Sequence, residues 1–318
     1  SIYRLTYFKD ALELWQDAVA RQPYNHVAHI NYGVELLNRK QLEQAIEQFE
    51  QALQLAHKDF AKIHMELGTA LSLSGRSQDA IPHFEEALQL VPEEPAKVHQ
   101  FLAISLVNVG RAEDAISHFQ QAIDIGPDSG ELRRKLALAY AAAGRDKEAI
   151  SCFESALRAG FDSAELYNDL GMALVRDGRP ADAIVELQHA LRRRPDSAQV
   201  HYNLGVAWTA ADQSQRAVAE FQQALRMQPD YPAVHKSLGL ALVRANQAGA
   251  AVTHLEQALR QEPDSAELHY NLGVALVAAD RAGDAIIEFD RALRLQPDYP
   301  AAKTGLAQAL DAQQHSKK

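Results

Sequence analysis

Residues 266–299 read AELHYNLGVALVAADRAGDAIIEFDRALRLQPDY, and this stretch of 34 residues decides the fold. Its first half places Leu272, Gly273 and Leu276 on one side of a helix, because their spacing matches the helical period. The second half repeats this design with small and large residues at Ala285, Phe289 and Ala292. The stretch therefore predicts two amphipathic helices that face each other.

Two residues end these predicted helices. Asp280 tolerates the left-handed conformation that often follows the last turn of a helix. Pro297 stops the second helix, because its ring cannot continue the hydrogen-bonded turn. Two such helices cannot bury their apolar sides alone, so each copy must stack on the next.

The same pattern recurs along the chain at a fixed period, which predicts a solenoid. Eight copies cover residues 26–299, namely 26–60, 61–95, 96–129, 130–163, 164–197, 198–231, 232–265 and 266–299. Residues 1–25 read as an N-terminal half repeat with a lone second helix. Residues 300–314 read as a lone first helix, and residues 315–318 as a short polar tail.

Four positions hold nearly the same residue in every copy. The eighth position is small, at Gly33, Gly68, Ala103, Ala137, Gly171, Gly205, Gly239 and Gly273. The twenty-fourth is large and apolar, at Phe49, Phe84, Phe119, Phe153, Leu187, Phe221, Leu255 and Phe289. The twentieth and twenty-seventh positions are alanine in all eight copies, and a proline near the end is missing only at His57 and Phe161.

These positions resemble the pattern of the tetratricopeptide repeat family. The resemblance implies an all-α fold, an α-solenoid in which helix-turn-helix units form a right-handed superhelix. Each first helix should end on a left-handed residue, at Gly75, Gly110, Gly144, Gly178, Asp212, Asn246 and Asp280. Only the first copy departs from this rule, with Lys40.

Residues 14–33, LWQDAVARQPYNHVAHINYG, also resemble the start of the repeat region in transmembrane-and-repeat O-mannosyltransferases and their bacterial relatives. In those proteins the repeats follow a membrane-embedded catalytic domain. The resemblance implies an extracytoplasmic or membrane-anchored context, with this chain as the soluble region of a larger protein; the compartment itself stays unknown. The start at Ser1 without a methionine leads us to expect a processed or excised piece.

Composition excludes several functions. A formal charge of −10 disfavours nucleic acid as a partner, because phosphates need a basic surface. The one basic run, residues 192–194, ends a predicted second helix, where cations suit the helix dipole. No apolar run is long enough to insert this chain into a membrane, and the single cysteine, Cys152, excludes an internal disulfide. We find no catalytic or nucleotide-binding motif, and so expect no enzyme activity, cofactor or metal.

Histidine is conspicuous at the fourth position of six copies, at His29, His64, His99, His201, His235 and His269. A column of histidines could bind a metal or sense pH. Stacked helices lie roughly 8–10 Å apart, however, whereas a metal needs nitrogen ligands about 2 Å away. Histidines of adjacent repeats should therefore not share an ion, and we favour a packing role for them.

The inner, concave face of the solenoid is the candidate binding surface. In the family it is lined by the first helices, which here carry an aliphatic strip with polar edges. Its candidate partner-binding residues are Val34, Leu37, Ile104, Arg134, Leu138, Met172, Val175, Tyr202, Val206, Lys236, Leu240, Val243, Arg244, Tyr270 and Val274. Such a strip suits an extended peptide or an amphipathic helix. The alternative is that these aliphatics pack against neighbouring repeats and are mostly covered.

Two functions follow from this organisation. The first is a non-catalytic scaffold for protein–protein interaction, which binds a peptide or protein segment in the concave groove. The second is a structural protein in which copies of the chain join end to end into a filament through the unpaired terminal helices. The apolar residues at the ends that would make this contact are Tyr7, Phe8, Leu12, Trp15, Leu306 and Leu310.

Overall fold

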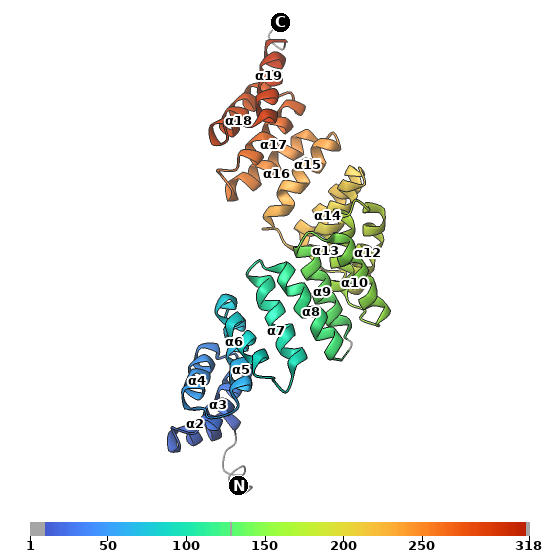
Figure 1. Cartoon of the computed structure of the whole chain (residues 1–318). Coiled ribbons are helices and arrows are strands. Elements are labelled where there is room, and N and C mark those ends of the chain that lie inside the picture. The colour runs from blue at the N-terminus through green and yellow to red at the C-terminus, as the bar shows by residue number, and fades with distance from the viewer. Residues whose placement is uncertain (1–9, 128, 316–318) are drawn as a thin grey trace. The chain divides into compact units, whose positions relative to one another are not determined.

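The computed structural model describes residues 10–127 and 129–315 of the chain. Within these ranges it contains eighteen α-helices and no β-strand, which confirms the all-α prediction. Contacts between residues divide the chain into two units, residues 1–161 and 162–318. Figure 1 shows helix following helix in chain order within each unit.

In the described part of unit 1, helix α2 (Ala11–Arg21) comes first and is followed by four helical hairpins. Their first helices are α3 (His26–Asn38), α5 (Phe60–Leu73), α7 (Pro95–Asn108) and α9 (Gly130–Ala142). Their second helices are α4 (Leu42–Leu55), α6 (Ser77–Gln89), α8 (Ala112–Ile125) and α10 (Asp146–Arg158). Helices α5 and α7 begin one residue before the repeat boundaries proposed from the sequence.

Unit 2 also has four hairpins, and it ends with the lone helix α19 (Pro300–His315). The first helices are α11 (Ala164–Arg176), α13 (Ala198–Ala210), α15 (Pro232–Arg244) and α17 (Ala266–Ala278). The second helices are α12 (Pro180–Arg193), α14 (Ser214–Met227), α16 (Ala248–Gln261) and α18 (Ala282–Leu295).

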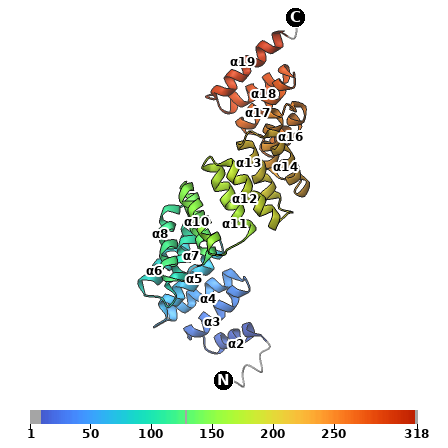
Figure 2. The same cartoon turned by 90° about the vertical axis from the view of Figure 1, so that its right-hand side faces the viewer.

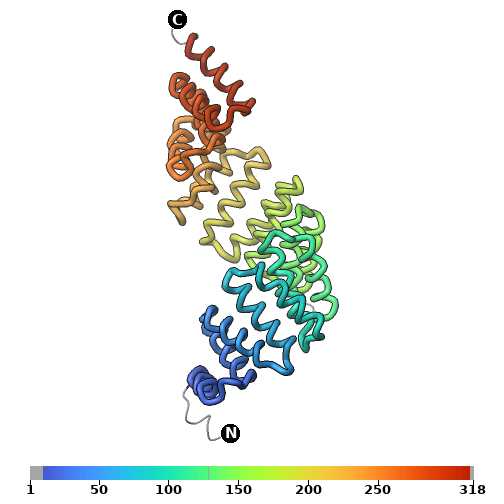
Figure 3. Tube along the Cα trace, turned by 60° about the vertical axis from the view of Figure 1, so that its left-hand side comes forward, coloured from blue at the N-terminus to red at the C-terminus, as the bar shows by residue number. Residues whose placement is uncertain are grey.

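The helices of each unit form two layers. The two helices of each hairpin pack against each other, and within a unit each second helix packs against the first helix of the next repeat. Successive first helices also touch one another, as α3 touches α5 and α15 touches α17, whereas successive second helices make no comparable contact in the described ranges. The first helices are therefore the inner layer of each unit, and the second helices the outer layer. Figures 2 and 3 allow the hairpins to be followed one by one.

Close contact inside the hairpins explains the small residue at the eighth position. A Cβ atom added to Gly33 or Gly205 would lie 2.6 Å from the ring of Phe49 or Phe221, which is too close for non-bonded atoms. A Cβ on Gly171 would meet Leu187 at the same distance. The alanines at the twentieth and twenty-seventh positions are buried in all eight hairpins. We call these four positions the hairpin seam.

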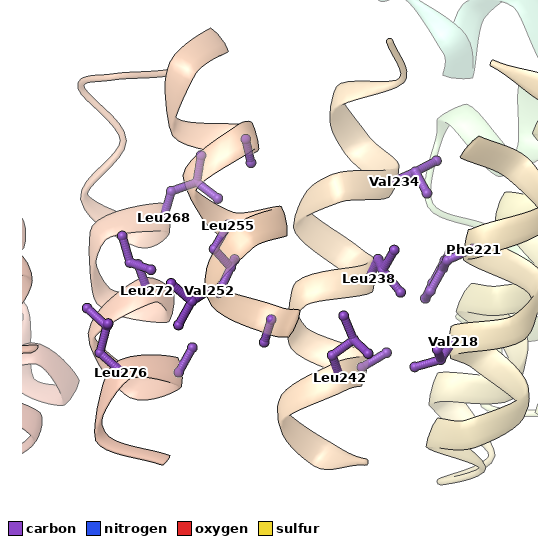
Figure 4. Packing of buried hydrophobic residues seen from close by; sticks show 14 of the residues in the cluster. Val218, Phe221, Val234, Leu238, Leu242, Val252, Leu255, Leu268, Leu272 and Leu276 are labelled. Carbon is purple, nitrogen blue, oxygen red and sulfur yellow. The ribbon is translucent and has the colours of Figure 1, made fainter. Parts of the chain in front are cut away.

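Figure 4 shows how the hairpins of unit 2 join. Phe221 on α14 points toward Leu238 on α15, Val218 lies one turn away on α14, and Leu255 on α16 lies beside Leu268 on α17. All five side chains are at most 6% exposed. The apolar core therefore continues from one hairpin to the next, as stacking requires.

The turns inside the hairpins confirm the predicted left-handed residues. All seven residues named for this role have φ between 56° and 85°. Lys40 was expected to depart from the rule, but it has φ 60° and makes the same turn. The turn therefore does not require Gly, Asn or Asp at this position.

The junction at Phe161, which lacks the usual proline, is built differently. Gly160 adopts φ 81°, and the backbone N–H of Phe161 donates a hydrogen bond to the carbonyl oxygen of Ala156 at 3.1 Å. A left-handed glycine after the last turn ends α10 in place of a proline. Unit 1 ends at this residue.

Candidate functional site

The predicted binding residues all lie on first helices and are only partly covered. None of them is buried, and only Leu138 and Arg244 are exposed. In unit 2, Val206, Val243 and Val274 pack on the core with one side and leave the other side accessible. We call the accessible side of the first helices the inner face. The sequence left two alternatives open, an accessible strip and side chains mostly covered by neighbouring repeats. The exposure of the inner face is intermediate between the two.

A row of hydrogen bonds crosses the inner face of unit 2. The hydroxyl of Tyr231 donates to Oε1 of Gln199 at 2.6 Å, and Nε2 of Gln199 donates to Oδ1 of Asn203 at 3.1 Å. Nδ2 of Asn203 then donates to Oδ1 of Asn168 at 2.7 Å. The ring of Tyr202 lies 5.5 Å from that of Tyr231. The row links α11, α13 and the start of α15.

The same positions two repeats later form an incomplete row. The rings of Tyr270 and Tyr299 lie 5.1 Å apart, as the earlier tyrosine pair does. Asn271 is 7% exposed, and its Nδ2 has no hydrogen-bond partner in the described residues. Lys236 stands where the earlier row has an accepting asparagine, and its Nζ donates to Glu267 at 2.6 Å. A lysine has no acceptor, which leaves the amide donor of Asn271 unsatisfied.

The inner face of unit 1 has a different character. Glu66 on α5 is half-buried, and burial raises the pKa of its carboxyl group, although Lys97 and Lys62 act in the opposite direction. The ring of Phe101 stacks on Phe84 at 6.1 Å between centroids. Oγ of Ser105 donates to Oγ of Ser72 at 3.0 Å. The inner faces of the two units therefore carry different side chains, although both are formed by first helices of the same repeat.

The histidines at the fourth position pair within their own hairpins. Each places Nδ1 against the side chain 19 residues later, on the second helix. The pairs are His29–Gln48, His64–His83, His99–His118, His201–Glu220, His235–His254 and His269–Glu288, at 2.6–3.1 Å. We call them the hairpin pairs. The prediction for these histidines concerned adjacent repeats, and it missed these partners within the hairpin, although their constant separation of 19 residues is visible in the sequence.

Three of the pairs are histidine–histidine pairs, with Nδ1–Nδ1 distances of 2.9 Å, 3.0 Å and 3.1 Å in chain order. Their ring centroids lie 5.2–5.4 Å apart, and the two ring planes are inclined by 25–30°. Burial lowers the pKa of five of these rings, which favours their neutral form: His64, His83, His99, His118 and His254.

The basic run at residues 192–194 makes local contacts. The guanidinium of Arg193 lies over the ring of Tyr167 at 4.3 Å and pairs with Asp162. Arg194 pairs with Glu165 at 2.6 Å. Two of the three arginines thus tie the end of α12 to its neighbour α11, and the run does not form a free basic patch.

The two lone helices have uncovered faces. Helix α2 has no buried residue, and its Leu12 and Trp15 are half-buried. In α19, Leu306 is half-buried, Leu310 is 43% exposed, and Ala307 at the eighth position is also exposed. Tyr7 and Phe8 lie outside the described residues.

The described parts of the chain contain neither a metal cluster nor a membrane-spanning helix. No group of three or more His, Cys, Asp or Glu side chains is arranged to hold a metal ion. Among the helices described, none is long and apolar enough to cross a membrane.

Comparison with solved structures shows the fold alone, because identities are below 25%. The APC/C hetero-tetramer Cut9–Hcn1 matches with a TM-score of 0.62 at 21% identity, over 89% of this chain and 55% of the other. A tetratricopeptide repeat protein from Parabacteroides merdae matches with 0.62 at 13%, over 80% and 100%. PilW, a type IV pilus biogenesis factor, matches with 0.61 at 22%, over 66% and 98%. This chain thus spans about half the length of the first of these proteins.

Comparison with curated proteins found no match. A sequence profile of the tetratricopeptide repeat matches residues 3–56, 168–232 and 236–300, which is more than half of the chain. Two further profiles of the same repeat match residues 59–128 and 106–170. The repeated seam, the stacked hairpins and these matches agree, and the chain belongs to the tetratricopeptide repeat family.

Proposed function

We propose that this chain is a non-catalytic scaffold that binds a peptide or protein segment on the inner face of its first helices. Members of this family characteristically mediate protein–protein interaction, and no catalytic family matches the chain. The observation that carries the proposal is the inner face of unit 2, where half-buried aliphatics stand beside a row of hydrogen-bonding groups. Such a surface offers apolar contact and backbone recognition together.

The unsatisfied amide of Asn271 supports a peptide as the ligand. A buried polar group without a partner costs free energy, so a ligand that supplies an acceptor to this amide gains binding free energy. A peptide backbone carries one carbonyl acceptor per residue. Rotation of the Asn271 side chain toward the inner face would bring its amide to such a carbonyl.

A charge-reversal experiment tests the proposal. Peptides are first selected from a display library on the immobilised full chain, and their affinity is measured by fluorescence anisotropy. Val206→Glu with Leu240→Glu places two carboxylates on adjacent first helices, where both side chains are half-buried. We expect at least a tenfold loss of peptide affinity with helical content unchanged.

The matched control carries the same charges on the outer layer. Val185 on α12 and Ile287 on α18 are 50% and 52% exposed, so Val185→Glu with Ile287→Glu should leave peptide affinity unchanged. Equal loss in both double variants would contradict binding at the inner face. Unfolding of the inner-face variant alone would mean that these aliphatics serve the core and not a partner.

End-to-end assembly is the second candidate, and the exposed side of α19 favours it. In the other first helices the residue at the eighth position is buried, whereas Ala307 is exposed and Leu310 beside it is 43% exposed. A lone second helix such as α2, from another copy, has the shape to cover this side. A neighbouring repeat of the same polypeptide would cover it equally well.

Light scattering against concentration tests assembly. The proposal expects the apparent mass of the chain to rise with concentration, and Ala307→Glu with Leu310→Glu to abolish the rise. A constant monomer mass at high concentration would end the filament proposal and leave the scaffold proposal untouched.

The resemblance of residues 14–33 to O-mannosyltransferase-like proteins supports a proposal only about the larger protein to which this chain would belong. Under it, the scaffold would be the repeat region of a protein whose catalytic domain precedes residue 1. The upstream coding sequence tests this directly. An open reading frame without membrane-spanning segments would exclude it.

A further inference from the structure

We propose that the three histidine–histidine hairpin pairs are chelating sites for divalent transition-metal ions such as Ni²⁺ or Cu²⁺. The sites are His64/His83 in the α5–α6 hairpin, His99/His118 in the α7–α8 hairpin, and His235/His254 in the α15–α16 hairpin. Each supplies two imidazole nitrogens, and water would complete the coordination of the ion.

The distance between the two nitrogens fits a particular coordination geometry. Metal–imidazole bonds are about 2.0–2.1 Å long, so two ligands at a right angle have nitrogens about 2.9 Å apart. The observed separations are 2.9 Å, 3.0 Å and 3.1 Å. Two ligands of a tetrahedral ion would be about 3.4 Å apart. The pairs therefore suit the right-angled ligands of Ni²⁺ or Cu²⁺ better than tetrahedral Zn²⁺.

The hydrogen bonding of His235 directs a lone pair into the site. Its Nε2 lies 3.2 Å from the carbonyl oxygen of Pro229, which can only accept, so this nitrogen carries the proton. In the neutral ring Nδ1 is then the unprotonated nitrogen, and it faces Nδ1 of His254. A backbone carbonyl that fixes the tautomer in this way is a common second partner of metal-bound histidine.

Carboxylates distinguish the two sites of unit 1 from the site of unit 2. Glu86 acts electrostatically on His64, and Asp79 acts on His83. At the next site, Glu85 and Asp114 act on His118, partly offset by Arg111. Their negative charge favours a cation beside the rings.

In the site of unit 2, no carboxylate among the described residues acts comparably on His254. His254 borders an open cavity of about 430 Å³, whose lining includes Arg226. The cavity gives an ion and its waters room, but the arginine opposes a second cation. We therefore expect the two sites of unit 1 to bind more tightly than the site of unit 2.

The remaining hairpin pairs supply a conservative substitution for the test. Gln48 occupies the position of the second histidine in the first hairpin and hydrogen-bonds Nδ1 of His29 at 2.8 Å. His83→Gln, His118→Gln and His254→Gln thus copy a pair that the chain already uses, and they should preserve the packing. Gln48→His should instead create a fourth site.

Titration calorimetry with Ni²⁺ on the full chain, purified without a histidine tag, measures the sites. Ni²⁺ is preferred to Cu²⁺ because it does not oxidise the free thiol of Cys152. We expect the wild-type chain to bind three more ions than the triple Gln variant. Each single variant should lose one ion, or weaken that site at least tenfold. Gln48→His should gain one ion, with unchanged circular dichroism.

Equal stoichiometry and affinity in the wild type and the triple variant would overturn the proposal, because binding would then come from other histidines. A triple variant that fails to fold leaves the test to the single variants and to Gln48→His. If folded single variants bind as the wild type does and Gln48→His gains nothing, the pairs are hydrogen bonds only.

Discussion

The hairpin seam and the inner face follow opposite rules within one chain. In the seam, the twentieth and twenty-seventh positions are alanine in all eight copies, and the eighth is always Gly or Ala. On the inner face, the sixth position holds a different type of side chain in most copies, among them Glu66, Phe101, Lys135 and Asn203. The seam is buried and closely packed, whereas the inner face is partly exposed.

This difference separates the seam positions, which build the fold, from the inner-face positions, which can distinguish one partner from another. In six copies of the seam a glycine lies directly against the large side chain of the second helix, so an added Cβ must displace that side chain. On the inner face, a side chain packs on one side only, and its other side is free to vary. Substitutions in the hairpin seam and on the inner face test whether stability depends on the seam more strongly than on the face.

The largest effect should come from enlarging the seam. Ala224 on α14 is completely buried, and Ala224→Leu adds three carbon atoms where no space exists. We expect the free energy of unfolding to fall by about 3 kcal/mol. Ala233→Leu, on the exposed start of α15, should change it by less than about 0.5 kcal/mol. Thermal unfolding of both variants checks this, and equal melting temperatures would contradict the assigned repeat register.

A smaller change in the seam should have a smaller cost. Gly205→Ala would place its Cβ 2.6 Å from Phe221, which must shift, and we expect a loss of about 1–2 kcal/mol. Gly249 lies inside α16 and has no heavy atom near an added Cβ. Gly249→Ala should therefore stabilise the chain by about 0.5–1 kcal/mol, because glycine is a poor helix former. Denaturant unfolding should show opposite signs for the two variants.

A substitution on the inner face should stabilise the protein in a pH-dependent way. Burial raises the folded-state pKa of Glu66, so stability falls as the pH rises from the unfolded-state pKa to the folded-state pKa. Glu66→Gln removes this penalty. We expect a higher melting temperature than wild type at pH 7, and no difference near about pH 3, where the carboxyl group is protonated in both states.

The smallest expected effect concerns the turn of the first hairpin. Lys40 has φ 60° and Gly75 has φ 85° at the same place in the next hairpin. Lys40→Gly should stabilise by about 0.5 kcal/mol, because relief of the left-handed strain slightly exceeds the entropy cost of glycine. Gly75→Lys should have the opposite sign, since an added Cβ there meets no neighbouring atom and only the backbone is strained. Chemical unfolding midpoints of both variants provide the measurement.

The sequence predicted the seam well because its contacts are local and repeat with one period. Gly205 and Phe221 are 16 residues apart in one hairpin, so the spacing alone predicted that they would meet. It also identified the side chains of the inner face, such as Val206 and Tyr270, but not how far each is covered.

Polar contacts were harder to predict. Whether a side chain finds a partner depends on its direction and on one neighbour in another element. Asn203 has an acceptor and Asn271 does not, because the preceding repeat offers an asparagine in one case and Lys236 in the other. The histidine partners were missed for the same reason.

The short range of the helix contacts has a consequence for how the chain folds. In the described residues, every pair of helices in substantial contact is at most two places apart along the chain. Contact order is therefore low, and little loop-closure entropy opposes each step of folding. A hairpin emerging from the ribosome has its stacking partner already synthesised. We expect this protein to form repeat by repeat during translation, from α2 onward, without waiting for its C-terminus.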